Sequence, residues 1–339
     1  MQTPVQTVLA VDDRSAVGEA RRIAARLAEK LGFTGPAAGA LAVVVTEAAT
    51  NVVKHAGRGE LILGAVQRGA TSGIELLALD RGPGFANPAR ALRDGHSTAG
   101  SPGTGLGAIQ RMASEFDMHS VPGKGMALRL VVWSRVPVTP DDETRIGSVC
   151  LPKSGEVACG DAWTAIRARH GHVLCMVDGL GHGADAAAAA RTAIAAVADC
   201  AVSGAAAGQT IEALHLALRH TRGAAAAVAL LHADEAMCTF CGVGNISACI
   251  ITDGVSRSMV SYNGILGHQT RKIQEFKYPF AEGALCVLHS DGVATRWRLD
   301  DYPGLERSHP GLVAGVLYRD YSRRRDDTAV LAVRRSGRA

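Results

Sequence analysis

Two polar residues, Glu47 and Asn51, lie four positions apart in the apolar stretch "VVTEAATNVVKHAG", residues 43–56. Four residues are about one turn of an α-helix, so both side chains project from the same side of a predicted helix. A carboxylate can accept a proton from a hydroxyl group, and an amide oxygen suits Mg²⁺. Taken alone, the stretch is more typical of the solvated side of an amphipathic helix, because buried polar groups cost free energy unless they find partners.

Two further segments of the first half change this interpretation. In "DRGPGF", residues 80–85, Asp80 ends a predicted strand, where a carboxylate can accept a hydrogen bond from a purine amino group. The stretch "SPGTGLGAIQRMASEF", from Ser101, is a glycine-rich loop that opens into a helix. Glycines let the backbone approach a ligand closely, and a helix N-terminus favours phosphate. The three segments in this order predict a nucleotide pocket.

The second half contains five aspartates at the ends of predicted strands, each of them next to a glycine or to another aspartate. They are Asp161 in "CGDAW", Asp178 in "VDGLGHG", Asp291 in "HSDGV", and Asp326 and Asp327 in "RRRDDTAV". Asp-Gly is also a common turn dipeptide, and we assign Asp253 in "ITDGV" to a turn. The other carboxylates, brought to one sheet edge, would repel one another unless a cation neutralised them. Oxygen ligands suit Mg²⁺ or Mn²⁺, and a pair of such ions can activate water for attack on phosphorus.

The elements that must position these residues fall into two sets. The first half predicts a strand, helices over residues 15–31 and 36–56, strands over 60–68 and 73–80, a loop, another helix and further strands. The second half alternates apolar strands with helices near residues 184–202 and 209–220. The stretch "RVPVTPDDETRIG" has the composition of a linker. We therefore predict domains over residues 1–136 and 147–339, joined by a linker over 137–146.

Length and composition narrow the functional classes. A chain of 339 residues is long for one core, so two domains are expected. The net charge of +4 gives no case for nucleic-acid binding. The first residues lack the pattern of a signal peptide, and the most apolar stretch carries Asp185, Arg191 and Asp199, which disfavours a membrane span. We expect a cytoplasmic protein without a membrane partner, whose eight cysteines, including the Cys238 and Cys241 pair, are mainly small buried residues.

The motifs of the first half resemble the N, G1 and G2 boxes of the GHKL ATPase superfamily. More narrowly, "TEAATNVVKHAG", "DRGPGF" and "GTGLGAIQRMASEFDMHSVPGKGMALRLVVW" resemble the anti-sigma-factor and stressosome serine kinases of the RsbT and SpoIIAB type, over roughly residues 5–135. The resemblance implies ATP and Mg²⁺, with Asn51 as the Mg²⁺ ligand and Glu47 as the general base for a protein serine. It also implies that Asp80 binds adenine, that Gly82 and Gly84 shape the pocket, and that three glycines lie along the phosphates: Gly103, Gly105 and Gly107. No phosphoacceptor-histidine helix precedes the N box, which disfavours a sensor histidine kinase.

The motifs of the second half resemble the PPM-type metal-dependent protein phosphatases of the bacterial SpoIIE and RsbX branch, over roughly residues 145–335. The resemblance implies two Mn²⁺ or Mg²⁺ ions, with Asp178 bridging both and the carbonyl of Gly179 binding one. Asp291 and Asp326 would complete one shell, and Asp161 would serve the other ion, directly or through water. The choice between Asp326 and Asp327 stays open, as does the role of His182, either a proton donor or a structural residue at a helix start.

Together the resemblances imply an α/β (α+β) fold, a GHKL (Bergerat) α/β sandwich followed by a PPM αββα sandwich. They imply a bifunctional partner-switching regulator, with kinase and phosphatase activities on STAS-domain proteins. A sigma factor or a stressosome-like complex is a further partner class, and a homodimer is compatible with the kinase type. The alternative is a nucleotide-gated binding module that controls the attached phosphatase and transfers no phosphate.

Overall fold

The structure is a computed structural model of residues 1–339, which describes all residues except 2, 88–91, 93–104, 139–143, 170 and 336–339. Its contacts form two compact units. The N-terminal unit comprises Pro4–Asp142 and Leu299–Arg319, and the C-terminal unit comprises Met1–Thr3, Glu143–Arg298 and Asp320–Ala339. The division at residues 137–146 stays a prediction, and residues 139–143 of that linker lie outside the described residues.

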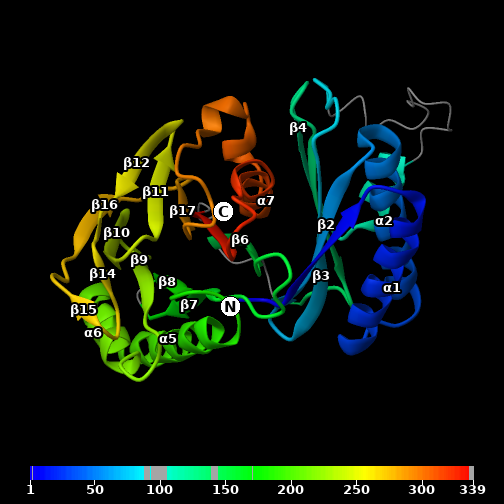
Figure 1. Ribbon diagram of the computed structural model, residues 1–339. Helices are drawn as coiled ribbons and strands as arrows, with labels where there is room; N and C mark the ends of the chain where they lie inside the picture. The colour runs from blue at the N-terminus through cyan, green and yellow to red at the C-terminus, as the bar shows by residue number, and fades with distance from the viewer. Residues whose placement is uncertain (2, 88–91, 93–104, 139–143, 170, 336–339) are drawn as a thin grey trace. The chain divides into compact units, whose positions relative to one another are not determined.

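The N-terminal unit is built on a five-stranded antiparallel sheet with the order β1-β2-β3-β5-β4 (Figure 1). The strands are β1 (Gln6–Val11), β2 (Gly59–Arg68), β3 (Thr71–Asp80), β4 (Glu115–Ser120) and β5 (Met126–Trp133). The helices are α1 (Arg14–Lys30), α2 (Gly35–Asn51), the π-helical turn η1 (Val52–Ala56) and α4 (Gly105–Met112). The order of elements matches the sequence prediction.

Helices α1 and α2 pack on one face of this sheet (Figure 1). Asp13 caps α1 by accepting hydrogen bonds from the main-chain N–H groups of Ser15 and Ala16. Four alanines at intervals of four residues then form the buried side of α1: Ala16, Ala20, Ala24 and Ala28. Side chains at this spacing share one side of a helix, and their small size lets α1 lie close to the core that α2 and the sheet form.

The opposite face of this sheet is also buried, under a segment from much later in the chain. Residues 299–319 comprise the 3₁₀ turns η2 (Leu299–Asp301) and η3 (Leu305–Arg307) and nearly all of helix α7 (Pro310–Tyr321). A Cβ atom added to Gly315 of α7 would lie 3.1 Å from Cδ2 of Leu79 on β3. The main-chain N–H of His309 donates a hydrogen bond of 2.6 Å to Oδ2 of Asp117 on β4. Both faces of the sheet are therefore covered by packed chain.

The C-terminal unit consists of two sheets around a shared core. One has the order β13-β10-β9-β8-β7, with β16 also paired to β10, and the other has the order β12-β11-β17-β18-β6. The strands of the first sheet are β7 (Asp161–Ala168), β8 (Gly171–Gly179), β9 (Ala224–His232), β10 (Met237–Val243), β13 (Ser261–Tyr262) and β16 (Phe276–Pro279). Those of the second are β6 (Thr144–Leu151), β11 (Ser247–Thr252), β12 (Val255–Met259), β17 (Leu285–His289) and β18 (Thr328–Arg335), and a separate ribbon joins β14 (Gly264–Ile265) to β15 (Gln269–Thr270).

Helices α5 (Ala184–Ser203) and α6 (Ala207–Ala217) cover the outer face of the first sheet and form a second core with it. Cys238 and Cys241 lie on opposite faces of β10, because Cys238 belongs to the core between the sheets and Cys241 to the core under the helices. This placement suits two small buried residues and not one metal or redox pair. Asp253 and Gly254 form the two-residue turn between β11 and β12, both with positive φ, so the turn assigned to Asp253 is confirmed.

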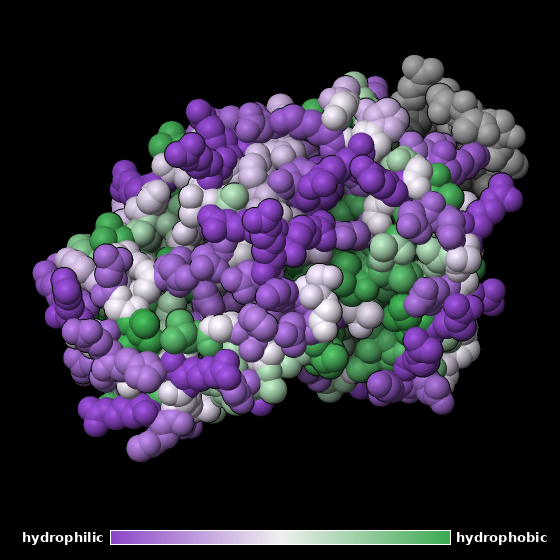
Figure 2. All heavy atoms as spheres, in the orientation of Figure 1, coloured by the Kyte–Doolittle hydropathy of each residue, from purple (hydrophilic) through white to green (hydrophobic). Residues whose placement is uncertain are grey.

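Two helical stretches, Gly35–Ala56 and Ala184–Ser203, are long and apolar enough by composition to cross a membrane. Each contributes buried residues to the core of its unit, which is the usual role of such a helix in a globular protein. Hydrophilic residues cover most of the face seen in Figure 2. The predicted mixed α/β architecture, with one sandwich in each half of the sequence, is confirmed.

Candidate functional sites

The first candidate site begins where α2 passes into the π-helical turn η1. Asn51 is the last residue of α2, and Glu47 lies one turn before it, half-buried. A π turn within a helix is frequent at functional sites. Nδ2 of Asn51 is buried and has no hydrogen-bond partner among the described residues. A buried amide without a partner is unusual, and rotating it by 180° would turn its oxygen, a Mg²⁺ ligand, into the same space.

Asp80, at the end of β3, is nearly inaccessible to solvent. Its Oδ1 accepts hydrogen bonds from the N–H of Gly82, at 2.8 Å, and from the N–H of Met126, at 3.2 Å. Burial raises the pKa of this carboxyl, and the two N–H donors and the nearby Arg319 oppose the rise. Because both bonds go to Oδ1, Oδ2 can accept a hydrogen bond from a ligand such as an adenine amino group.

The glycines of the predicted G1 box allow close chain packing beside Asp80. A Cβ atom on Gly82 would lie 2.8 Å from Cβ of Ala56 in η1, and one on Gly84 would lie 2.2 Å from the carbonyl oxygen of Val121. Gly84 also has a φ of 60°. A larger residue at Gly82 would displace η1, and one at Gly84 would displace the turn after β4. These contacts bring the N-box helix and the end of β3 together, as a shared nucleotide pocket requires.

The glycine-rich loop is described only in part. Gly103 lies outside the described residues. Gly105 is the first residue of α4, and Gly107 is buried within the first turn of that helix. Helices α2 and α4 pack against each other in the same core. The residues present therefore fit a nucleotide with Mg²⁺: an orphaned amide, a buried acceptor at a strand end and a helix start in one unit.

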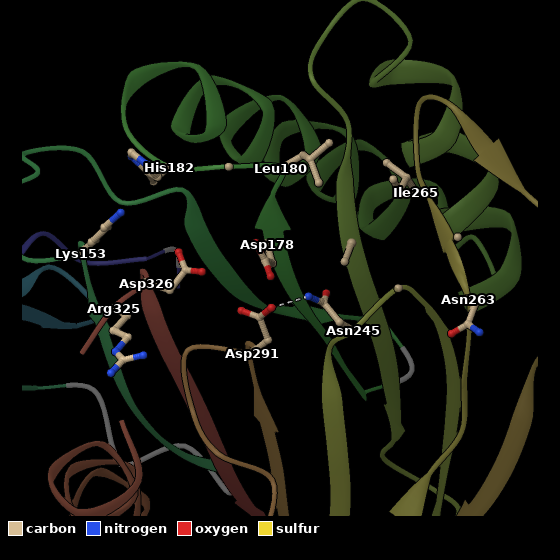
Figure 3. A pocket seen from close by; sticks show the side chains of 14 residues that line it. Lys153, Asp178, Leu180, His182, Asn245, Asn263, Ile265, Asp291, Arg325 and Asp326 are labelled. Atoms are coloured by element: carbon tan, nitrogen blue, oxygen red, sulfur yellow. Dashed lines mark hydrogen bonds between the residues drawn. The ribbon is translucent and has the colours of Figure 1, made fainter. Parts of the chain in front are cut away.

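The second candidate site lies at one end of the strands of the C-terminal unit. Asp161 and Asp178 are directly opposite each other in the antiparallel pair of β7 and β8. Asp291 follows β17, and Asp326 precedes β18. Asp178, Asp291 and Asp326 line a cavity of about 420 Å³, and Figure 3 shows their carboxylates around the same space. The structure thus brings together acids that lie far apart in the sequence.

The neighbouring acids Asp326 and Asp327 differ in what they contact. Both oxygens of Asp327 are used, because Oδ1 accepts from the N–H of Lys153 at 2.7 Å and Oδ2 from the N–H of Gly160 at 2.8 Å. Asp327 is buried, whereas Asp326 is exposed and lines the cavity. The geometry favours Asp326 as a metal ligand. Asp327, just before β18, instead connects to the residue before β7 by a hydrogen bond.

Burial and the neighbouring negative charges both shift the pKa values of these acids upward. Burial raises the pKa of Asp178 to about 7, and the negative charges of Asp291 and Asp326 contribute to the rise. Burial, followed by the charge of Asp178, raises the pKa of Asp161 well above its usual value. A divalent cation would offset both causes by supplying positive charge. In the described part of the chain, no three His, Cys, Asp or Glu side chains form a closed ligand shell, and the three carboxylates instead line one open cavity.

Three residues of this site were missed in the sequence. Nδ2 of Asn245 donates a 2.8 Å hydrogen bond to Oδ2 of Asp291, drawn as a dashed line in Figure 3. Oγ of Ser290 donates a 2.6 Å hydrogen bond to Oδ2 of Asp161, and Lys153 lines the cavity. Gly244, which precedes Asn245, has a φ of 100°, and a Cβ added to it would lie 2.3 Å from Cβ of Ala225, so the close approach of the chain here requires glycine.

His182 also lines this cavity, and its Nδ1 lies 2.8 Å from Oε1 of Glu156. The pair is at the surface. Gly179, the last residue of β8, donates its N–H to the carbonyl of Gly160 at 3.0 Å. An added Cβ there would lie 2.3 Å from the carbonyl oxygen of Ala186, so only glycine allows α5 to start this close to the site.

Comparisons with known proteins assign each half to a family. Residues 10–132 match the family described as "Histidine kinase-like ATPase domain", and residues 169–336 match "Stage II sporulation protein E (SpoIIE)". The serine/threonine-protein kinase RsbT of Bacillus subtilis (strain 168) is 31% identical over 116 residues, which are 34% of this chain and 87% of that protein.

Solved structures agree with this assignment. A structure from the bacterial stressosome is 30% identical and has a TM-score of 0.53, covering 57% of this chain and all of that one. The PP2C phosphatase domain of SpoIIE from Bacillus subtilis, with a fragment of its regulatory domain, has a TM-score of 0.50 at 17% identity and covers 81% of this chain and 82% of that one. At that identity the likeness concerns the fold.

Proposed function

Because this chain belongs to the family of RsbT-like serine/threonine kinases and carries a SpoIIE-type phosphatase domain after its kinase domain, we propose that it both phosphorylates and dephosphorylates protein serine or threonine residues. The substrates that we propose are STAS-domain proteins of a partner-switching pathway. A sigma factor or a stressosome-like complex is the proposed further partner, and a homodimer the proposed assembly. Both domains belong to soluble signalling classes typical of cytoplasmic proteins, so we place the protein in the cytoplasm.

In the proposed kinase site the chain's own residues bind ATP and accept one proton. Oδ2 of Asp80 would accept a hydrogen bond from the adenine amino group, and Gly82 and Gly84 let the chain beside Asp80 pack against Ala56 and Val121. Asn51 would hold Mg²⁺ through its amide oxygen. Glu47, one helical turn away, would take the proton from the substrate hydroxyl as that oxygen attacks the γ-phosphorus and ADP leaves with the bridging oxygen.

In the proposed phosphatase site Asp178, Asp291 and Asp326 would hold divalent cations, with Asp161 and the carbonyl of Gly179. When bound, such ions lower the pKa of water and neutralise charge on a phosphoryl group. Asn245 orients Asp291 through its hydrogen bond, and Ser290 orients Asp161. Lys153 and His182 line the same cavity, where a phosphate group would be close to both.

One observation supports the phosphatase proposal most strongly: the carboxylates of Asp178 on β8, Asp291 after β17 and Asp326 before β18 line a single cavity. Burial, with the charges of Asp291 and Asp326, raises the pKa of Asp178 to about 7. The test is hydrolysis of a phosphoserine STAS-domain protein from the same genome with Mn²⁺, with EDTA, and by Asp178→Asn. We expect phosphate release that needs the metal and is lost in Asp178→Asn. Asp234→Asn, an exposed acid of the same unit, is the matched control. Release that persists in EDTA would contradict the proposal.

For the first half the alternative is a nucleotide-gated binding module that controls the phosphatase and transfers no phosphate. The presence of Glu47, half-buried beside Asn51, favours the kinase. We expect Glu47→Ala to abolish phosphate transfer from ATP to the STAS protein while ATP and partner binding remain. Thr50→Ala, exposed on the same helix, is the control. A wild-type protein that binds its partner but never phosphorylates it would establish the binding module instead.

A further inference from the structure

One arginine from the second half of the sequence contacts the nucleotide pocket of the first. Arg319 of α7 lies within the residues that match the phosphatase family and far outside those that match the ATPase family. It is 5% exposed. Its Nη1 donates hydrogen bonds to the carbonyl oxygens of Asp80, at 2.7 Å, and Met126, at 3.1 Å.

These two carbonyls flank the carboxylate that we assign to adenine. The N–H of Met126 donates to Oδ1 of Asp80, so Arg319 holds the main chain of both residues that form that bond. Hydrogen bonds from a buried guanidinium to carbonyls are charge-assisted and stronger than neutral ones. The main chain is closely packed around Asp80, since a Cβ atom on Gly125 would lie 2.1 Å from the carbonyl oxygen of Asp80. Moving Arg319 would therefore move the end of β3.

The rest of the 299–319 segment is fixed to the same side of the sheet. Nζ of Lys124 donates to the carbonyl oxygen of Asp301 at 2.7 Å, and Nε2 of His119 lies 3.1 Å from that of Pro303. Arg81, the residue after Asp80, donates in turn to the carbonyl oxygen of Arg319. The segment 299–319 is thus held near its start, at Asp301 and Pro303, and at its end, at Arg319.

Beyond Arg319 the chain runs directly into the phosphatase site. The N–H of Ala294 donates to the carbonyl oxygen of Tyr321, and the N–H of Arg323 to that of Gly292, which follows Asp291. Val293 and Ser322 form an isolated β-bridge. Asp326 follows Arg319 by seven residues. The short path from the pocket to Asp326 is therefore paired with the turn that carries Asp291.

We propose that Arg319 is a positioning residue of the nucleotide pocket, and that through α7 a bound adenine nucleotide alters the activity of the phosphatase site. The inference rests on the proposed nucleotide and phosphatase sites and adds the residue that joins them. A nucleotide that binds Asp80 fixes the end of β3, which fixes Arg319 and the path to Asp326. By thermodynamic linkage, ions bound at the phosphatase site change the nucleotide affinity by the same factor.

The test uses the full chain and the variants Arg319→Ala, Arg319→Lys and Arg307→Ala. Arg307 lies in the same segment with a side chain that is 89% exposed, which makes it the matched control. Calorimetry with ADP and GDP should show that Arg319→Ala binds ADP about tenfold more weakly and discriminates less between the two bases. Arg319→Lys should restore part of the affinity, and Arg307→Ala should equal the wild type. A purely structural role would not change base discrimination.

The second measurement is hydrolysis of p-nitrophenyl phosphate with Mn²⁺, with and without ADP. The ratio of the two rates should differ from one in the wild type and return to one in Arg319→Ala. Unchanged ADP affinity and base preference in Arg319→Ala would overturn the inference and leave the proposed function intact. A wild type that binds no ADP would instead reject the nucleotide site itself.

A measurement on the unmodified protein covers the case in which Arg319→Ala does not fold. Bound ADP should slow hydrogen exchange at the main-chain amides of residues 310–319, because those residues pack behind the pocket. Protection that is confined to the ATPase motifs would overturn the inference.

Discussion

Adjacent residues of this protein have different environments, and Asp326 and Asp327 illustrate the consequence. Asp326 is exposed to the cavity, whereas both oxygens of Asp327 accept main-chain N–H groups. Asp327 is held by these main-chain groups and is not among the residues that line the cavity, so it is the less suitable ligand. Changing Asp326 to Asn should therefore affect catalysis, whereas changing Asp327 to Asn should affect stability.

We predict that Asp326→Asn lowers the phosphatase kcat by about 100-fold and leaves stability nearly unchanged, since the loss of one proposed ligand affects metal binding and not packing. Asp327→Asn should instead lower the free energy of unfolding by about 1–3 kcal/mol, because an amide can replace only part of the acceptor capacity. Phosphate release and urea unfolding of both variants make the comparison. Equal effects of the two substitutions on kcat, at unchanged stability, would refute the assignment.

At the scale of elements, the face of the N-terminal sheet under residues 299–319 carries charge. Nε of Arg129 on β5 lies 2.6 Å from Oε1 of Glu75 on β3, and its Nη1 lies 3.0 Å from Oε2 of Glu115 on β4. Burial lowers the pKa of Arg129, but the two glutamates raise it by more. The three strands are thus joined by ion pairs as well as by their backbone ladders.

Removing the positive charge of Arg129 should lower the stability of the protein. We predict that Arg129→Met lowers the free energy of unfolding by about 3–5 kcal/mol, because it leaves the buried Glu75 uncompensated. Arg68 also pairs with Glu115, but its side chain is 24% exposed, so Arg68→Met should cost only about 0–1 kcal/mol. Denaturant unfolding of both variants measures the difference, and similar losses for the two would contradict the prediction.

His119 makes the same face sensitive to acid. Burial lowers the pKa of His119, while its contact with the carbonyl of Pro303 opposes the shift. A folded-state pKa below the unfolded value of about 6.5 means that the unfolded chain binds the proton more tightly. The contribution of His119 to stability is therefore full above about pH 6.5 and is lost as the pH falls through its folded-state pKa.

We expect His119→Gln to flatten the dependence of unfolding free energy on pH between about 7 and 5. Neighbouring charges at Asp117, Glu306 and Arg319 also act on this group, so the comparison is made between variants and not against one absolute slope. His220→Gln, an exposed histidine of the other unit, should keep the wild-type profile. Parallel profiles for His119→Gln and the wild type would reject the prediction.

At the scale of the whole molecule, each unit contains a segment from the other end of the sequence. Met1–Thr3 belongs to the C-terminal unit, where the N–H of Thr3 donates to the carbonyl oxygen of Trp163 on β7 at 2.9 Å. Leu299–Arg319 belongs to the N-terminal unit. The two halves of the sequence are therefore not the two halves of the fold.

Because each unit contains a segment from the other half of the sequence, the two fragments of a chain cut within residues 137–146 should remain associated. We predict that a protease site inserted there gives two fragments that elute as one species in size-exclusion chromatography under native conditions. Fragment 1–138 produced alone should aggregate, because it lacks the cover over Leu77 and Leu79. Fragments that separate on cleavage, or a soluble, folded 1–138, would show that residues 299–319 are dispensable.

The sequence was sufficient to predict the two families, the mixed α/β fold and most of the proposed site residues. It could do so because each motif is local: Glu47 and Asn51 are one helical turn apart, and each metal-binding candidate adjoins its own apolar strand. Helix α7 was missed because nearly all of its residues are buried, so it shows no amphipathic period.

The folded structure alone shows how distant parts of the chain complete those local groups. It distinguished Asp326 from Asp327 through N–H groups more than 160 positions away, at Lys153 and Gly160. It placed Asn245 beside Asp291 and Arg319 behind Asp80, a separation of 239 positions in the latter pair. Hydrogen bonds between such distant residues leave no periodicity in a single sequence, because they depend on which surfaces meet after the chain has folded.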